Sequence, residues 1–229
     1  MITRKQAVFV LNFVAGWVDA VGFLALVGSV EAFPSFMSGN STKVVTDLAS
    51  GKTDLAALVA GVVLVFIVGT ILSRLLNDGT RWRETGALAG VAGGLWVAVA
   101  GALAGFAGYT LLLLLAFGMG MINRALQGSN GFTVHTFVSG AVVTIGSDIA
   151  DAISGRGDWR QMLLPLSIWG AILAGALAGA ILTHQFGLLV ALPIPALAVS
   201  LLALANGAGW LEPASDARDG HSDAIEAHG

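Results

Sequence analysis

Six stretches of the chain are long and apolar enough to cross a lipid bilayer as helices, and this feature restricts the fold more than any other. A hydrocarbon core roughly 30 Å thick needs about 20 consecutive helical residues. Such stretches lie at Ala7–Val27, Leu55–Leu76, Gly86–Phe106, Tyr109–Leu126, Met162–Thr183 and Phe186–Ala205. The sequence therefore predicts an all-α membrane protein with six transmembrane helices.

Composition excludes several classes of function. Hydrophobic residues make up 56% of the chain and charged residues only 11%, whereas a soluble domain is about a quarter charged. The chain has no cysteine, so disulfide and thiolate chemistry are absent. No catalytic triad, metal-binding motif or nucleotide-binding loop is present. We therefore expect no enzyme activity, no cofactor, no metal and no nucleic-acid partner, and we expect contacts with membrane lipids and a small solute or ion.

The basic residues predict how the chain is oriented in the membrane. If the N-terminus is cytoplasmic, only Lys43 and Lys52 fall on the outer side. The cytoplasmic side then holds Arg4, Lys5, Arg74, Arg81, Arg83, Arg124, Arg156, Arg160 and Arg218. Because cytoplasmic loops carry the excess of Lys and Arg, both termini are expected in the cytoplasm.

An internal repeat divides the chain into residues 1–106 and 107–211, followed by an acidic tail, residues 212–229, that we expect to be disordered. Three short motifs recur in the same order. They are Gly16-Trp17-Val18-Asp19 with Gly120-Met121-Ile122-Asn123, Phe36-Met37-Ser38-Gly39 with Phe137-Val138-Ser139-Gly140, and Gly69-Thr70-Ile71-Leu72 with Gly179-Ala180-Ile181-Leu182. Since each half holds an odd number of spans, the second half must enter the membrane inverted. Inverted repeats are a common plan of secondary transporters.

Each half also contains a helical segment too short to cross, at residues 36–50 and 138–153. Residues 38–50 would form a helix about 20 Å long. We expect Ser38 and Ser139 to be N-caps, and Gly39 and Gly140 to allow close backbone approach. Two interpretations remain open. The segments are either re-entrant half-helices whose N-termini meet near the midplane, or amphipathic helices lying at the two membrane surfaces.

Asp19 is the most informative polar residue, because it lies inside an apolar span. Inserting an ionised carboxylate at such a depth costs about 2.5–3.5 kcal/mol even on the insertion scale that gives the lowest values. The group must therefore be protonated, paired with a cation or hydrated. It either binds a ligand and couples transport to protons, or forms a structural clamp between helices. Lys43 is its candidate charge partner, but Lys43 also lies four residues before Asp47.

The remaining candidate site residues follow from the repeat. The predicted substrate-binding set is Asp19, Ser38, Gly39, Asn40, Asn123, Ser139 and Gly140. The predicted coupling or charge-pair set is Asp19, Lys43, Asp47 and Asp148. The sign of the substrate stays open, because helix N-termini favour an anion whereas the three aspartates favour a cation.

Glycines recur at intervals of four in two spans. One span holds Gly86, Gly90 and Gly94 and, further on, Gly101 and Gly105; the other holds Gly175 and Gly179. Small faces of this kind let membrane helices approach closely. They predict tight helix packing and are also candidate surfaces for a homo-oligomer.

The motifs at the repeat also resemble a known family. The combination of Gly16-x-x-Asp19-Ala20, Phe36-x-Ser38-Gly39-Asn40, Gly120-x-x-Asn123 and Thr136-Phe137-Val138-Ser139-Gly140 is similar to the YoaK family, also called DUF1275. Where this chain has Ser38 and Ser139, the family usually has threonine, so the hydroxyl is kept. The resemblance implies a bacterial inner-membrane protein with several spans and implies nothing about the substrate.

We therefore predict a secondary transporter of a small solute, built from two inverted three-span repeats and coupled to protons through Asp19. A passive channel and a non-transporting membrane scaffold or accessory subunit are the alternatives. The same repeat would build a channel, and the glycine faces would be the working surface of a scaffold.

Overall fold

The computed structural model describes residues 1–25, 30–78, 80–126 and 138–212, and in these ranges the regular structure is helical. Six candidate membrane spans are present, as the sequence predicted. They are α1 (Arg4–Ala25), α3 (Thr53–Leu76), α4 (Arg81–Leu103), α5 (Gly108–Ala125), α7 (Leu163–Phe186), and α8 (Leu188–Ala191) together with α9 (Pro193–Gly207). Residues 213–229 of the expected tail lie outside the described residues.

The two short segments also form helices, α2 (Met37–Ala49) and α6 (Val138–Ile153). The prediction that Ser38 and Ser139 cap them is wrong, because both serines lie inside their helices. Phe36 occupies the N-cap position of α2 and makes no side-chain capping bond. Backbone carbonyls take the place of a cap there, since the Met37 N–H donates to the Ser35 carbonyl at 3.0 Å and the Asn40 N–H donates to the Phe36 carbonyl at 3.1 Å.

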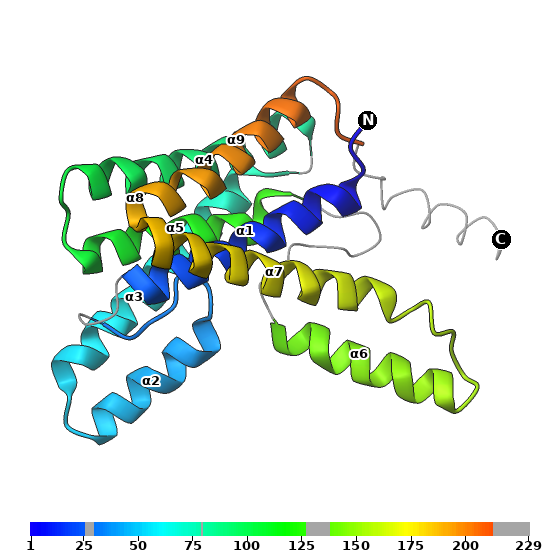
Figure 1. Cartoon of the computed structure of the whole chain (residues 1–229), viewed down its shortest axis with the longest axis horizontal. Helices are drawn as coiled ribbons and strands as arrows, with labels where there is room; N and C mark the ends of the chain where they lie inside the picture. Colours follow the sequence, from blue (N-terminus) through cyan, green and yellow to red (C-terminus); the bar gives the residue numbers. More distant parts are fainter. Residues whose placement is uncertain (26–29, 79, 127–137, 213–229) are drawn as a thin grey trace, which may run out of the picture.

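Two close helix pairs form the frame of the molecule: α1 packs along α7, and α3 packs along α5 (Figure 1). At each crossing a glycine of either helix lies against a backbone carbonyl of the other. The pairs are Gly16–Ile172 and Gly175–Phe13 in the first crossing, and Gly120–Phe66 and Gly69–Phe117 in the second. Because a side chain at these positions would collide with backbone, glycine permits the close approach.

The other predicted small faces are used within the chain as well. Gly90 faces the Met121 methyl group at 2.7 Å from its ideal Cβ position, and Gly179 faces the Trp17 carbonyl at 2.7 Å. Gly86 faces open space. Gly105 lies beyond the last residue of α4 at a φ of 75°, a conformation that glycine adopts without steric strain. Within the described residues, tight packing therefore accounts for most of the glycine pattern.

The last span is interrupted next to Pro193 and Pro195, where α8 ends and α9 begins. Pro195 has no N–H, so it cannot donate to the carbonyl of Ala191 as a helical residue would. The Trp17 indole N–H donates to that carbonyl instead, at 2.9 Å. The break between α8 and α9 is thus tied to α1, the helix that also carries Asp19.

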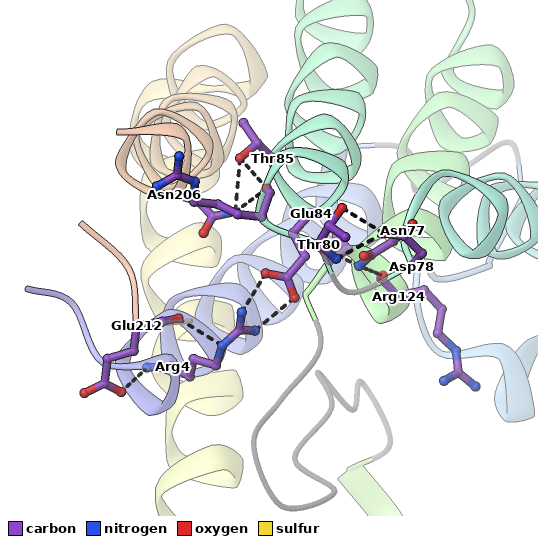
Figure 2. A network of polar contacts seen from close by, with 11 residues as sticks. Arg4, Asn77, Asp78, Thr80, Glu84, Thr85, Arg124, Asn206 and Glu212 are labelled. Atoms are coloured by element: carbon purple, nitrogen blue, oxygen red, sulfur yellow. Dashed lines mark hydrogen bonds and ion pairs between the residues drawn. The ribbon is translucent and has the colours of Figure 1, made fainter. Parts of the chain in front are cut away.

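The two ends of the described chain meet beside a buried ion pair (Figure 2). The Ile2 N–H donates to the Trp210 carbonyl at 2.6 Å, and the Glu212 N–H donates to the Ile2 carbonyl at 3.0 Å. Next to them, Arg4 donates two hydrogen bonds to Glu84, at 3.0 and 2.6 Å. Both side chains are almost fully buried. The pair joins the first turn of α1 to the first turn of α4.

The chain connections fall at two opposite ends of the molecule (Figure 1). The N-terminus and the α6–α7 connection lie toward one end, whereas the α2–α3 and α4–α5 connections lie toward the other. Large apolar side chains cover the outer faces of α3 and α7; Leu75 is 71% exposed and Leu177 is 64% exposed. An apolar exterior of this kind suits helices that face hydrocarbon rather than water.

Candidate ligand-binding cavity at Asp19

The carboxylate of Asp19 is held by one residue, Ser35, from the loop that precedes α2. The Ser35 N–H donates to Asp19 Oδ1 at 2.7 Å, and the Ser35 hydroxyl donates to Oδ2 at 2.6 Å. Ser35 is buried. Each carboxylate oxygen therefore has one strong donor, and the loop is fastened to α1 at this point.

A second clamp fixes the same loop to α2. The buried side chain of Asn40 accepts the Phe33 N–H at 3.0 Å and donates to the Phe33 carbonyl at 2.7 Å. Its amide is also 3.8 Å from the sulfur of Met37. Asn40 was predicted to bind substrate; in the structure its amide is engaged by the protein and sets the position of Phe33.

A cavity of about 560 Å³ opens beside Asp19. Its walls come from α1 and α7, from Phe33 and Ser35 of the loop, and from one residue at the start of each short helix. These are Phe36, the N-cap residue of α2, and Val138, the first residue of α6. A volume of this size falls within the range of about 300–1,000 Å³ that is typical of small-molecule sites.

The N-terminal ends of α2 and α6 thus reach the same cavity. In Figure 1 both helices begin near the middle of the molecule and then run outward toward opposite ends. Each packs against the helix that follows it, α2 on α3 and α6 on α7. The two short helices therefore bring backbone from both halves of the chain to the region of Asp19.

Lys43 does not neutralise Asp19 in the structure. Its ammonium lies 3.1 Å from Asp47 Oδ2 and 3.8 Å from Glu31 Oε2. The Lys43–Asp47 contact is an ion pair without hydrogen-bond geometry, since that same oxygen accepts no hydrogen bond. Of the two partners that the sequence offered Lys43, the structure selects Asp47, which lies one turn along the same helix.

Helix α2 buries two polar side chains against the protein, while its serines and threonines are exposed. Asn40 and Asp47 are buried, whereas Val45 and Leu48 are 65% and 52% exposed. An amphipathic helix in a soluble protein shows the opposite arrangement. Helix α6 has no buried residue in the structure, so the two predicted repeat copies differ in how fully they pack.

The other predicted site residues lie away from Asp19. Ser38, Ser139 and Gly140 are exposed and do not line the cavity. Gly39 lies under the ring of Phe36, where a side chain would collide with that ring. Of the seven residues predicted to bind substrate, the structure places Asp19 in the cavity wall.

The second-half counterparts have different surroundings. The Asn123 side chain donates to the Met119 carbonyl of its own helix at 2.9 Å and makes further contacts. Asp148 is partly buried on α6. Phe137 of the repeat motif, and Thr136 of the family motif, lie outside the described residues. Among the described residues, no group of three His, Cys, Asp or Glu side chains is placed to hold a metal ion.

Sequence reasoning missed the residues that complete the site. Ser35 and Phe33 lie 16 and 14 residues after Asp19 and belong to none of the three repeat motifs. The one local signal was Pro34, which predicts a turn immediately before Ser35. The ion pair of Arg4 with Glu84 was also missed, because its partners are 80 residues apart.

Comparisons with known proteins identify a family without a function. A family model described as "Protein of unknown function (DUF1275)" matches residues 7–205. This match confirms the resemblance that the motifs indicated. Neither curated proteins nor solved structures give a match to the chain.

Proposed function

The chain belongs to the DUF1275 family of proteins of unknown function, and from that premise we propose that it is a secondary transporter. It moves a small solute across the bacterial inner membrane, and Asp19 couples the movement to protons. The observation that carries the proposal is the cavity beside Asp19, a carboxylate on a membrane-spanning helix that is held by two donors from Ser35. Intramembrane carboxylates mark solute and proton pathways in transporters.

The arrangement of the helices supports an inverted repeat. The α1–α7 and α3–α5 crossings pack in the same way: glycines of each helix lie against backbone carbonyls of its partner. If α1 corresponds to α5, then α7 corresponds to α3, and each crossing joins one helix from either half. This correspondence pairs Gly69 with Gly175, one helical turn from the Gly69–Gly179 match in the sequence. Exchange of equivalent helices between halves suits rocking of one repeat against the other.

The short helices favour the re-entrant interpretation. A helix lying on the membrane surface turns its apolar face toward the hydrocarbon and its polar face toward water. Helix α2 instead buries Asn40 and Asp47 against protein and exposes Val45 and Leu48. Its N-cap residue Phe36 adjoins the cavity, as does Val138, the first residue of α6. Both features fit half-helices enclosed within the membrane.

The distribution of basic residues supports cytoplasmic termini. The α6–α7 connection, with Arg156 and Arg160, lies toward the same end of the molecule as the N-terminus (Figure 1). Lys52 belongs to the α2–α3 connection at the opposite end. The end that is rich in arginine is assigned to the cytoplasm by the positive-inside rule.

A flux assay tests the proposal directly. The full chain is reconstituted into liposomes that contain a pH indicator, and a panel of organic cations, amino acids and sugars is added outside. We expect one or more solutes to drive saturable proton movement in the wild type and in Asp54→Asn, a control that changes an exposed carboxylate at the start of α3. Asp19→Asn is expected to abolish that movement.

Other outcomes identify the alternatives. Flux that neither saturates nor responds to a proton gradient would indicate a passive channel. Absence of flux for every solute, together with a stable co-purifying partner, would indicate a scaffold. Equal proton movement in Asp19→Asn and the wild type would remove the coupling role of Asp19.

A further inference from the structure

The lining of the Asp19 cavity defines a class of ligand. The described lining residues include one charged group, Asp19, and one hydroxyl, that of Ser35. No Lys, Arg or His is among them. The rest of the wall is made of alanine, glycine, aliphatic side chains and three phenylalanines. The cavity therefore combines a single negative charge with a large apolar surface.

The three phenylalanines form one connected aromatic wall. The rings of Phe23 and Phe33 are stacked with centroids 4.9 Å apart, and Phe36 meets Phe33 edge-on at 5.8 Å. Two hydrogen bonds between the Asn40 side chain and the Phe33 backbone, one donated by each residue, fix the middle ring. Phe23 and Phe36 keep 39% and 43% of their surface exposed, so the protein covers neither ring fully. The face of an aromatic ring attracts cations.

The charge of Asp19 has no cationic partner among the described residues. Lys43, the partner that the sequence suggested, instead pairs with Asp47 and Glu31. The N–H of Ser35, two residues before α2 begins, donates to Asp19. The described lining of the cavity thus presents one carboxylate and no cationic side chain.

We propose that this cavity binds a monovalent organic cation with an apolar body, such as a quaternary ammonium or phosphonium compound. The cation lies against the Asp19 carboxylate and the Phe23–Phe33–Phe36 wall, while its apolar part fills the space between α1 and α7. An inorganic metal ion is disfavoured, because Asp19 and Ser35 offer few of the six to eight oxygen ligands that a hard cation such as Ca²⁺ needs. This inference rests on the proposed transport function and names the class of its substrate.

Two probes of equal shape and opposite charge test the inference. Tetraphenylphosphonium and tetraphenylborate are each dialysed to equilibrium against the purified full chain in detergent, and binding to protein-free micelles is subtracted. We expect saturable binding of the phosphonium, competition by benzyltrimethylammonium, and no saturable binding of the borate. Asp54→Asn is the matched control and is expected to bind the phosphonium as the wild type does.

Variants of the wall separate its two components. Asp19→Asn is expected to weaken phosphonium binding by about tenfold or more, because a charge-assisted contact is lost. Phe23→Leu keeps the apolar volume but removes a ring face, so a loss of about two- to fivefold is expected. This conservative variant keeps the inference testable if Asp19→Asn does not fold.

Several results would overturn the inference. These are saturable borate binding as tight as that of the phosphonium, equal binding of the neutral triphenylphosphine oxide, and phosphonium binding that is unchanged in both Asp19→Asn and Phe23→Leu. Equal binding of the neutral probe would indicate an apolar cleft that lipid chains fill. If liposomes show Asp19-dependent flux of another solute while the phosphonium does not bind, the transport proposal stands and this inference fails. Phosphonium binding without any flux would support the cation site and contradict the transport proposal.

Discussion

Helix α1 carries a charged group near each end, and the protein treats the two in opposite ways. At the first turn, Arg4 is buried and pairs in a bidentate fashion with Glu84, with a further bond from its Nε–H to the Glu212 carbonyl at 3.0 Å. Toward the other end, Asp19 receives two donors from Ser35 and has no cation beside it among the described residues. One charge is neutralised within the protein, and the other faces a cavity.

Under the proposed function, this difference separates a charge that stabilises the fold from a charge that binds a ligand. Removing one partner of a buried ion pair leaves an uncompensated charge, which strongly destabilises a protein. A carboxylate beside a cavity can instead be neutralised by a ligand or a proton, so its charge is available for binding. The same chemical change, carboxylate to amide, should therefore have different consequences at different positions, and four predictions test this.

The largest effect on stability is expected for Glu84→Gln. The amide cannot match the bidentate bond to the Arg4 guanidinium, so the free energy of unfolding should fall by about 3–5 kcal/mol. Thermal denaturation in detergent, followed by size-exclusion chromatography, measures the change. Glu31→Gln is the matched control, because the Glu31 side chain is 76% exposed and its contact with the Lys43 ammonium is long, at 3.8 Å.

A double variant sharpens this first prediction. Replacing both Arg4 and Glu84 with methionine removes the pair together, which should restore most of the stability lost in Glu84→Gln. A Glu84→Gln protein as stable as the wild type would show that the Arg4–Glu84 ion pair does not stabilise the fold. That result would contradict the distinction drawn between this pair and Asp19.

A smaller effect is expected on α2. Asp47→Asn removes the partly buried ion pair with Lys43, and a loss of about 0.5–1 kcal/mol follows from the typical strength of such pairs. Asp148→Asn on α6 is the control from the second half, where no ion pair with a described residue is present. Denaturation midpoints of the two variants should therefore differ, and equal midpoints would contradict the packing difference between α2 and α6.

Asp19→Asn should leave stability within about 1 kcal/mol of the wild type, since an amide can keep both contacts with Ser35. Its carbonyl oxygen accepts the Ser35 N–H, and its NH₂ group donates to the Ser35 hydroxyl oxygen. The variant also removes a charge that has no cationic partner among the described residues. The same denaturation assay applies, and a loss as large as that of Glu84→Gln would make Asp19 a structural charge.

The smallest effect concerns pH and an exposed group between α3 and α4. The N–H and hydroxyl of Thr80 both donate to Asp78, with help from nearby Arg83, and they lower the pKa of this carboxyl from its ordinary value of 3.8. A carboxyl whose pKa is lower in the folded state stabilises the protein above its unfolded pKa, and this contribution is lost as the pH falls through the folded pKa. Asp78→Asn should be slightly less stable than the wild type at neutral pH in thermal denaturation, and the difference should shrink below pH 3.8.

Much of the fold was predictable, because membrane helices follow from local composition. Six apolar stretches of sufficient length gave the six candidate spans within a few residues. Both short helices appeared where their amphipathic pattern placed them, and Pro193 and Pro195 coincide with the break in the last span. The two serine caps failed because both serines lie inside their helices, and at α2 backbone carbonyls such as that of Ser35 accept the first N–H groups instead.

The candidate site was predictable only in part. Asp19 could be singled out because a carboxylate in an apolar span is costly wherever its partner lies. Its partner could not be deduced, since nothing local distinguishes Lys43 from Ser35 as a neighbour of Asp19. Asn40 was recognised as unusual, but its hydrogen bonds to Phe33 give it a positioning role that no spacing rule contains.

The sequence by itself determined which segments are helical, which of them are long enough to span a membrane, and which polar residue is hardest to accommodate there. These properties depend on residues within one or two helical turns. Tertiary structure alone decided that Arg4 meets Glu84, that Ser35 holds Asp19, and that α2 buries Asn40 and Asp47. Such contacts depend on how closely the helices cross and on the path of each loop, and both are set by packing between residues far apart in the chain.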